Sequence, residues 1–189
     1  QPGVWDMVFW VNRTRKNVWT TYYYVDSDWA GEKDYSHTKS RTGVIILLNG
    51  LPIFWRSNKQ PTTAMSSAAA EIVALSECAK DVKLRMFIAE EAGVNVKKPY
   101  QINVDNKSAI SFQKCMNPDS KLKGVFDLRS QWIKELHSKG KFKAVKVDTT
   151  KNLADELTKP LNASTRKQLE IELNRIKQLT TSSAPLGGK

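Results

Sequence analysis

The 189-residue chain has little cysteine and no long hydrophobic run. Its two cysteines, Cys78 and Cys115, are too few for a disulfide framework, which favours a reducing compartment. We expect the cytoplasm or nucleus, or an organelle if a targeting segment has been removed, since the chain begins at Gln1 as a fragment or processed product would. No apolar stretch approaches the roughly 20 residues that a membrane span needs, so no membrane partner is expected.

Acidic residues are also in deficit: 19 Asp and Glu stand against 30 Lys and Arg, a formal net charge of +11. Clustered Lys and Arg gain free energy by releasing counterions from phosphates, so this balance indicates a polyanionic partner. A hydrophobic content of 40% with six tryptophans excludes a mostly disordered chain. The length suits one domain with short extensions.

The apolar pattern predicts an α/β fold, a five-stranded mixed sheet with helices on both faces. Asn49-Gly50 between two apolar runs is a strong hairpin signal. Ser66 or Ser67 is expected to cap a long helix that stops at Gly93. Strands are predicted at 20–28, 42–48, 51–57, 100–105 and 142–147, and helices at 67–92, 107–116, 126–137, 152–157 and 165–179.

Four acidic residues follow or interrupt apolar stretches that should face a core: Asp26, Glu71, Asp105 and Asp155. A buried carboxylate needs a partner for its charge, because desolvating an unpaired anion costs several kcal/mol. Four gathered anions would repel one another unless a cation sat between them. On a basic chain, this predicts a divalent metal site with oxygen ligands and phosphodiester chemistry.

Each acid also has a simpler explanation. Asp105 could be a helix N-cap, Asp26 could be solvated, and Asp155 could be an acid favoured by a helix start. Glu71 lies four residues before Leu75 and so shares the apolar stripe of its helix, which charge near a helix start does not explain. Taken together and in this order, the four acids favour a functional site.

Five motifs resemble the ribonuclease H domain of copia-type LTR retrotransposon polyproteins. They are Asp26 to Gly31 (Asp-Ser-Asp-Trp-Ala-Gly), Lys39 to Gly43, the stretch from Lys59 to Glu71 (Lys-Gln-Pro, then Ser-Ser and Ala-Glu), Asp105 to Ile110, and Ala154 to Pro160. The resemblance implies a ribonuclease H-like fold over residues 22–161. Residues 1–21 resemble the end of the reverse transcriptase connection, 162–179 are expected to form a C-terminal helix, and 180–189 a disordered tail.

The resemblance further implies that Asp26, Glu71, Asp105 and Asp155 are catalytic and hold two Mg²⁺ ions, with Mn²⁺ able to substitute. The implied reaction is hydrolysis of the RNA strand of an RNA–DNA hybrid. The implied partners are such a hybrid or structured RNA, and a reverse transcriptase or ribonucleoprotein complex. The chain departs from the family at Ala68-Ala69-Ala70-Glu71, where Thr-Glu-Ala-Glu is frequent, without losing a ligand.

A lysine-rich stretch predicts where the nucleic acid binds. Its lysines would contact phosphates, and Asn106 and Gln60, which lie beside matched motifs, could touch ribose hydroxyls. The lysines of this stretch are Lys121, Lys123, Lys134, Lys139, Lys141, Lys143 and Lys146.

Two other functions compete with an active nuclease. One is a catalytically idle RNA-binding or scaffold subunit of a ribonucleoprotein, which the lack of a polymerase portion leaves open. The other is a different metal nuclease of the same superfold, such as an integrase. Integrase-type sites take their last acid from a helix after the second aspartate, whereas Glu71 precedes Asp105 here, which argues against them.

Overall fold

A computed structural model of the chain describes residues 18–29, 39–107, 110–111 and 128–182. Its centre is a five-stranded sheet in the order β3-β2-β1-β4-β5. β1 pairs antiparallel with β2 and β2 with β3, while β1 and β4, and β4 and β5, are parallel. The mixed sheet predicted from the sequence is confirmed. The strands are β1 (Thr21–Asp28), β2 (Arg41–Leu48), β3 (Leu51–Lys59), β4 (Tyr100–Val104) and β5 (Phe142–Lys146).

The β2–β3 hairpin turns at the predicted dipeptide. Asn49 has φ 48° and Gly50 φ 83°, the two positive values that a tight turn compatible with strand twist requires. Asn49 also accepts a hydrogen bond from the backbone N–H of Thr20 through Oδ1, at 2.9 Å. The turn is therefore joined to the start of the neighbouring strand β1.

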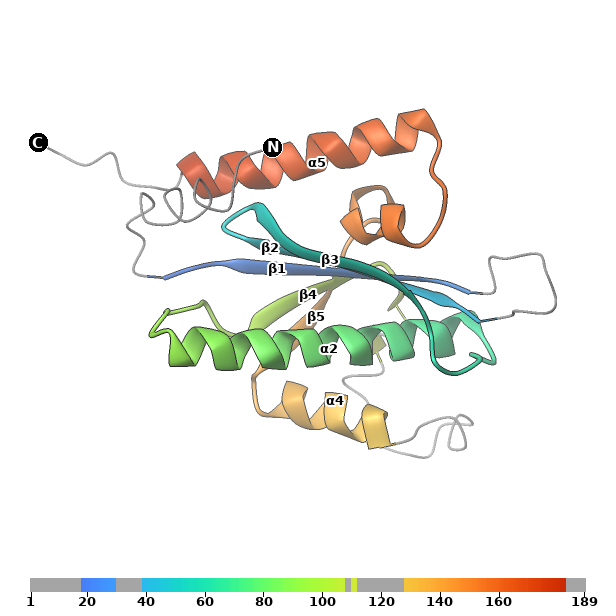
Figure 1. Cartoon of the computed structure of the whole chain (residues 1–189), viewed down its shortest axis with the longest axis horizontal. Helices are drawn as coiled ribbons and strands as arrows, with labels where there is room; N and C mark the ends of the chain where they lie inside the picture. Colours follow the sequence, from blue (N-terminus) through green and yellow to red (C-terminus); the bar gives the residue numbers. More distant parts are fainter. Residues whose placement is uncertain (1–17, 30–38, 108–109, 112–127, 183–189) are drawn as a thin grey trace, which may run out of the picture.

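Helices cover both faces of the sheet (Figure 1). α2 (Ser67–Glu91) and α4 (Leu128–Ser138) lie on one face. The 3₁₀ helices η1 (Thr149–Lys151) and η2 (Leu153–Leu157) lie on the other face with α5 (Ala163–Ser182). α2 begins as predicted, because the Ser66 hydroxyl accepts from the N–H of Ala69 at 3.1 Å.

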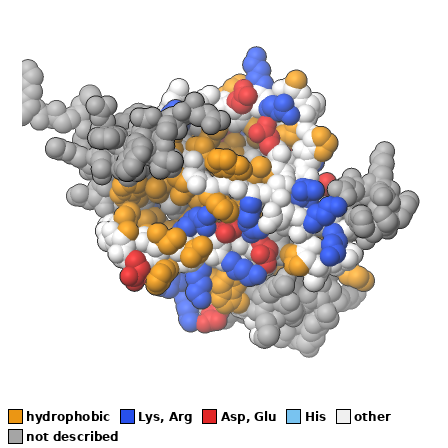
Figure 2. Space-filling view, viewed as in Figure 1, with side chains coloured by type: hydrophobic (Ala, Val, Ile, Leu, Met, Phe, Trp, Pro, Cys, Tyr) orange, Lys and Arg blue, Asp and Glu red, His pale blue; other side chains and the backbone are white. Residues whose placement is uncertain are grey.

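Strand alternation divides the core between the two faces. Tyr23 and Val25 of β1 are fully buried in a cluster with the apolar stripe of α2. Tyr24, pointing the other way, packs in a second cluster with Leu169 and Ile176 of α5. The apolar surface continues to the exterior on α2, where Leu84, Phe87 and Ile88 are each more than half exposed. Figure 2 shows hydrophobic side chains among Lys and Arg on this view of the molecule.

Some predicted segments differ from the structure or lie outside the described residues. The last helix is longer than the expected 165–179, so residues 180–182 are helical rather than part of a disordered tail. In the predicted helix 107–116, residues 107, 110 and 111 are helical and the rest lie outside the described residues, as do 1–17 and 183–189. Within the described part of the chain, no helix has the length and apolar character needed to cross a membrane.

Candidate metal centre

The parallel pairing of β1 and β4 brings two of the predicted acids together. Val25 pairs with Val104 in this register, so the next residues, Asp26 inside β1 and Asp105 just after β4, lie side by side toward the carboxyl ends of these two strands. Carboxyl ends of parallel strands are where sites collect in α/β sheets. The sequence prediction that Asp26 lies on the first strand and Asp105 at the end of the fourth is confirmed.

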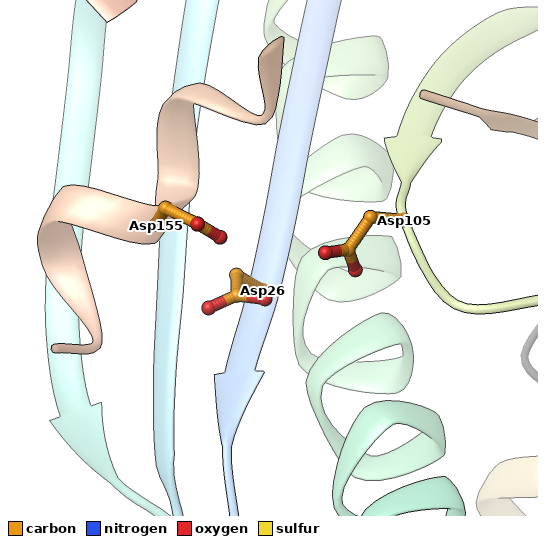
Figure 3. A group of neighbouring side chains, drawn as sticks. All are labelled: Asp26, Asp105 and Asp155. Carbon is orange, nitrogen blue, oxygen red and sulfur yellow. The ribbon is translucent and has the colours of Figure 1, made fainter. Parts of the chain in front are cut away.

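Asp155 arrives from η2, which is held against β1 by buried polar contacts. Asn152 donates from Nδ2 to the carbonyl oxygen of Val25 at 3.1 Å, and its Oδ1 accepts from the N–H of Ala154 at 3.3 Å. The Thr158 hydroxyl donates to Oδ2 of Asp26. Carboxylate oxygens of Asp26, Asp105 and Asp155 consequently lie within 4.8 Å of one another (Figure 3).

Glu71 reaches the same cavity from the opposite face of the sheet. α2 packs on the face of Tyr23 and Val25, whereas Asp26 shares the face of Tyr24 by strand alternation. Glu71 therefore lines the cavity with Asp26 and Asp105 but is not part of the group of close oxygens that the three aspartates form. The cavity measures about 460 Å³ and is lined by Asp26, Ser27, Ser67, Glu71, Asp105, Asn106, Lys107, Lys146 and Lys159.

Burial and repulsion between carboxylates shift the pKa values of Glu71, Asp26 and Asp155 upward. Burial, with repulsion from Asp26 and Asp105, raises the pKa of Glu71 to about 8. Burial raises the pKa of Asp26 to about 6, against the hydrogen bond from Thr158. Burial also raises the pKa of Asp155. A site that disfavours its own ionised form in this way gains from a bound cation.

Among the described residues, two buried carboxylate oxygens of this site have no hydrogen-bond partner, Oε2 of Glu71 and Oδ1 of Asp155. Buried polar atoms are usually paired, so each such atom calls for an explanation. Hard divalent ions such as Mg²⁺ bind carboxylate oxygens. The four acids therefore fit a divalent-ion site by donor type, burial and unsatisfied oxygens.

One lysine lies inside this anionic group. Nζ of Lys159 is 3.2 Å from Oδ2 of Asp155 and 4.0 Å from Oδ2 of Asp26. Burial by itself lowers the pKa of Lys159, but the carboxylates of Asp26 and Asp155 raise it overall. The ammonium therefore remains charged at neutral pH.

The position of η2 depends on a glycine in β2. A Cβ added at Gly43 would lie 2.8 Å from the carbonyl oxygen of Ala154 and 2.8 Å from Cβ of Leu157. Side-chain atoms at this distance would force η2 away from the sheet. The absence of a side chain at Gly43 is what allows Asp155 to approach Asp26.

The predicted nucleic-acid contacts fall in different places. Asn106 lines the cavity. The prediction that Gln60 contacts a ribose is not supported, because the residue is only 2% exposed. Its Nε2 donates to Oγ1 of Thr42 at 3.0 Å and to the carbonyl of Ala70 at 2.9 Å. Both of its N–H groups are thus used to join β2 to α2, and the side chain is not available to a ribose.

Of the described lysines in the predicted stretch, Lys146 lines the cavity, whereas Lys134, Lys139, Lys141 and Lys143 do not. Lys139 and Lys141 precede β5, and Lys143 is near its amino end, whereas the acids lie at the carboxyl ends of the parallel strands. Lys121 and Lys123 lie outside the described residues.

Two lysines that line the cavity were not predicted, Lys107 and Lys159, whereas Lys146 belongs to the predicted lysine-rich stretch. Lys146 is the last residue of β5 and donates to the backbone carbonyl of Asp105. Its place at the carboxyl end of a parallel strand, paired with Val104, brings it beside Asp105. For Lys159, the signal was its spacing of four residues from Asp155.

No family model matches the chain. Curated relatives are retrotransposon polyproteins: over 137 residues the chain is 35% identical to the retrovirus-related Pol polyprotein from transposon TNT 1-94 of Nicotiana tabacum, covering 72% of the chain and 10% of that protein. Over 133 residues it is 32% identical to the Ty1-JR1 Gag-Pol polyprotein of Saccharomyces cerevisiae, covering 69% of the chain and 7% of the polyprotein. The chain thus spans a tenth or less of the length of these relatives.

Among solved structures, LC11-RNase H1 in complex with an RNA/DNA hybrid superimposes with a TM-score of 0.51 at 19% identity, covering 74% of the chain and 93% of that structure. This similarity shows a shared fold, and it agrees with the mixed sheet and its helices. By sequence relatives and by fold, the chain belongs to the ribonuclease H domains of copia-type retrotransposon Pol polyproteins.

Proposed function

We propose that the chain is a metal-dependent ribonuclease H that cleaves the RNA strand of RNA–DNA hybrids. The observation that carries the proposal is the convergence of three aspartates, whose carboxylate oxygens lie within 4.8 Å of one another. They come from separate elements, β1, the end of β4 and η2. An arrangement that concentrates repulsive charge in this way is costly to a fold, and ion binding offers a reason for it.

Asp26, Asp105, Asp155 and Glu71 would together hold two Mg²⁺ ions, with Mn²⁺ as a substitute. When bound, a pair of such ions supplies a Lewis acid and a water of lowered pKa for in-line attack on phosphorus. The chain's own part is to fix the ligands. Thr158 holds Asp26 through its hydroxyl, and Asn152 fixes the segment that carries Asp155.

Lysines at the cavity provide for the polyanionic substrate. Lys107 and Lys146 line it together with Asn106, so a phosphate backbone that enters the cavity meets positive charge beside the carboxylates. This placement supports a nucleic-acid substrate. The hybrid named for the structural neighbour LC11-RNase H1 and the Pol polyproteins among the relatives support a hybrid substrate and a link to a reverse transcriptase.

The proposal is tested with a labelled RNA–DNA hybrid in Mg²⁺, comparing wild type with Asp105→Asn and Glu156→Gln. Asp105→Asn removes a charged ligand and should slow cleavage on the order of 10³-fold or more. Glu156 is adjacent to Asp155 but pairs with Arg166 at the surface, at 3.4 Å, so Glu156→Gln should cleave like wild type. If the wild type binds the hybrid yet leaves its RNA intact at ample Mg²⁺, the idle scaffold function replaces this one.

A further inference from the structure

The cavity already contains a cation supplied by the chain. Lys159 follows Asp155 by four residues, and its ammonium lies 3.2 Å from Oδ2 of Asp155 and 4.0 Å from Oδ2 of Asp26. Both carboxylates are buried: the side chain of Asp155 is 5% exposed and that of Asp26 is 3% exposed, whereas the Lys159 side chain is 38% exposed. The lysine therefore reaches the anions from the solvent side of the site.

This ammonium and a divalent ion would compete for the same negative charge. Oδ2 of both aspartates faces Lys159, and these aspartates belong to the group of oxygens that could hold an ion. A divalent ion among those oxygens would lie only a few ångströms from the ammonium. Like charges at that separation repel, so the two cannot share the site without loss of free energy.

The side chain is able to leave. Lysine carries its charge on a flexible four-carbon stem and is strongly hydrated. With more than a third of its surface already in solvent, Lys159 can turn outward without opening the core. The free energy of its ion pair with Asp155 is then lost, and this loss must be supplied by the incoming ion.

We infer that Lys159 is an internal counter-cation that neutralises the empty metal centre and is displaced when divalent ions bind. The inference rests on the proposed function, since it requires that the acids bind metal. Lys159 thereby offsets the negative charge of Asp26 and Asp155 in the folded domain and raises the ion concentration needed to load the site. It acts through the metal ligands and is a positioning residue.

A purely structural role for the same ion pair makes a different prediction. If Lys159 only fastened η2 to β1, its loss would loosen Asp155, lower the stability with or without metal, and weaken metal binding. A counter-cation, by contrast, stabilises the protein only while the site is empty and opposes metal binding. Metal affinity thus changes in opposite directions under the two roles.

The test is calorimetric titration of Mg²⁺, repeated with Mn²⁺, into wild type, Lys159→Met and Lys80→Met. Methionine keeps most of the stem length and removes the charge. Lys80 is the matched control, because it also forms an ion pair with an acid close to it in the sequence, Glu77 at 2.7 Å. Thermal unfolding is followed for each protein in EDTA and in saturating Mg²⁺, and Lys159→Gln provides a second variant if the methionine protein does not fold.

Lys159→Met should bind Mg²⁺ about tenfold more tightly than wild type, the size expected for removing one charge near the ion at a partly exposed site. It should unfold at a lower temperature than wild type in EDTA, and the difference should shrink or reverse in Mg²⁺. Lys80→Met should bind Mg²⁺ as wild type does. Equal or weaker binding by both Lys159 variants overturns the counter-cation role while leaving the nuclease proposal intact. No metal binding by wild type overturns both.

Discussion

Single residues decide whether the acidic side chains can come close together, and the clearest example is an uncharged residue, Gly43. Gly43 lies in β2 directly beneath η2, where an added Cβ would be 2.8 Å from the carbonyl oxygen of Ala154. A backbone oxygen cannot move aside as the end of a flexible side chain can. The Lys39 to Gly43 motif that the sequence analysis matched thus has a packing reason at its glycine.

We predict that Gly43→Ala pushes η2 off the sheet and displaces Asp155. Overpacking of this kind typically costs about 1–3 kcal/mol of unfolding free energy, and Mg²⁺ affinity should fall with it. Gly93→Ala is the comparison: Gly93 has φ +64° and nothing within 4 Å of an added Cβ, so alanine there is strained but far from any clash. Gly93→Ala should lose stability and keep its Mg²⁺ affinity, as measured by denaturation and calorimetry. Unchanged metal binding in Gly43→Ala would contradict the argument.

For single residues, the sequence was enough to identify the four acids but not all of the residues around them. Asp26, Glu71, Asp105 and Asp155 stood out because charge interrupts apolar runs, and all four line or adjoin the cavity. Gln60 was misjudged because its place beside a motif says nothing of burial, which follows from how β3 meets α2. The spacing of four residues from Asp155 hints at one contact of Lys159, but its approach to Asp26 spans 133 positions of chain, and no local pattern encodes it.

At the scale of elements, the strands, the hairpin and α2 were predictable because each is specified by local periodicity and capping. The packing of α5 was not predicted. Leu169 and Ile176 of that helix are buried against the sheet with Tyr24, so α5 is part of the core rather than an appendage. Its polar surface hides this role in the sequence, since only a narrow apolar stripe faces inward.

η2 positions Asp155, and Asn152 is one of the buried residues that link it to the sheet. The Asn152 side chain is fully buried and joins the carbonyl of Val25 to the N–H of Ala154. Because short 3₁₀ helices have little stability of their own, the position of η2 depends on such contacts. Local propensity therefore predicts that η2 exists but not where it lies.

Asn152→Ala should release η2 and leave the carbonyl of Val25 unpaired. The expected loss is about 1–3 kcal/mol in unfolding free energy, with cleavage reduced more than the fraction unfolded explains. Asn162→Ala is the control, because Asn162 also accepts from a backbone N–H, that of Thr165 at 2.8 Å, but at the exposed start of α5. Asn162→Ala should lose stability without a catalytic defect once both are assayed fully folded. Equal activity per folded molecule in the two variants would refute the role of Asn152.

For the whole molecule, overall charge and local charge have opposite signs. The chain carries +11, yet its cavity concentrates carboxyl groups whose pKa values are raised by burial. The net charge attracts a polyanion at long range, while the acids accept cations at short range. Stability should therefore respond to pH and to metal together, because both act on the same buried groups.

The final prediction concerns the pH dependence of stability without metal. The pKa of Glu71 is raised by burial from 4.5 to about 8 in the folded protein, so between these values the folded state holds a proton that the unfolded state has released. By linkage, this group's contribution to the unfolding free energy falls as pH rises through that window. Glu71→Gln cannot ionise, so in EDTA its stability relative to wild type should increase from pH 4 to pH 8, as followed by urea denaturation.

The control for this pH dependence is Glu91→Gln, at the exposed end of α2, which should show no such trend. Saturating Mg²⁺ should abolish the advantage of Glu71→Gln, because ions bind the ionised carboxylate. A constant difference between Glu71→Gln and wild type across this pH range would mean that Glu71 is not the strained acid of the site.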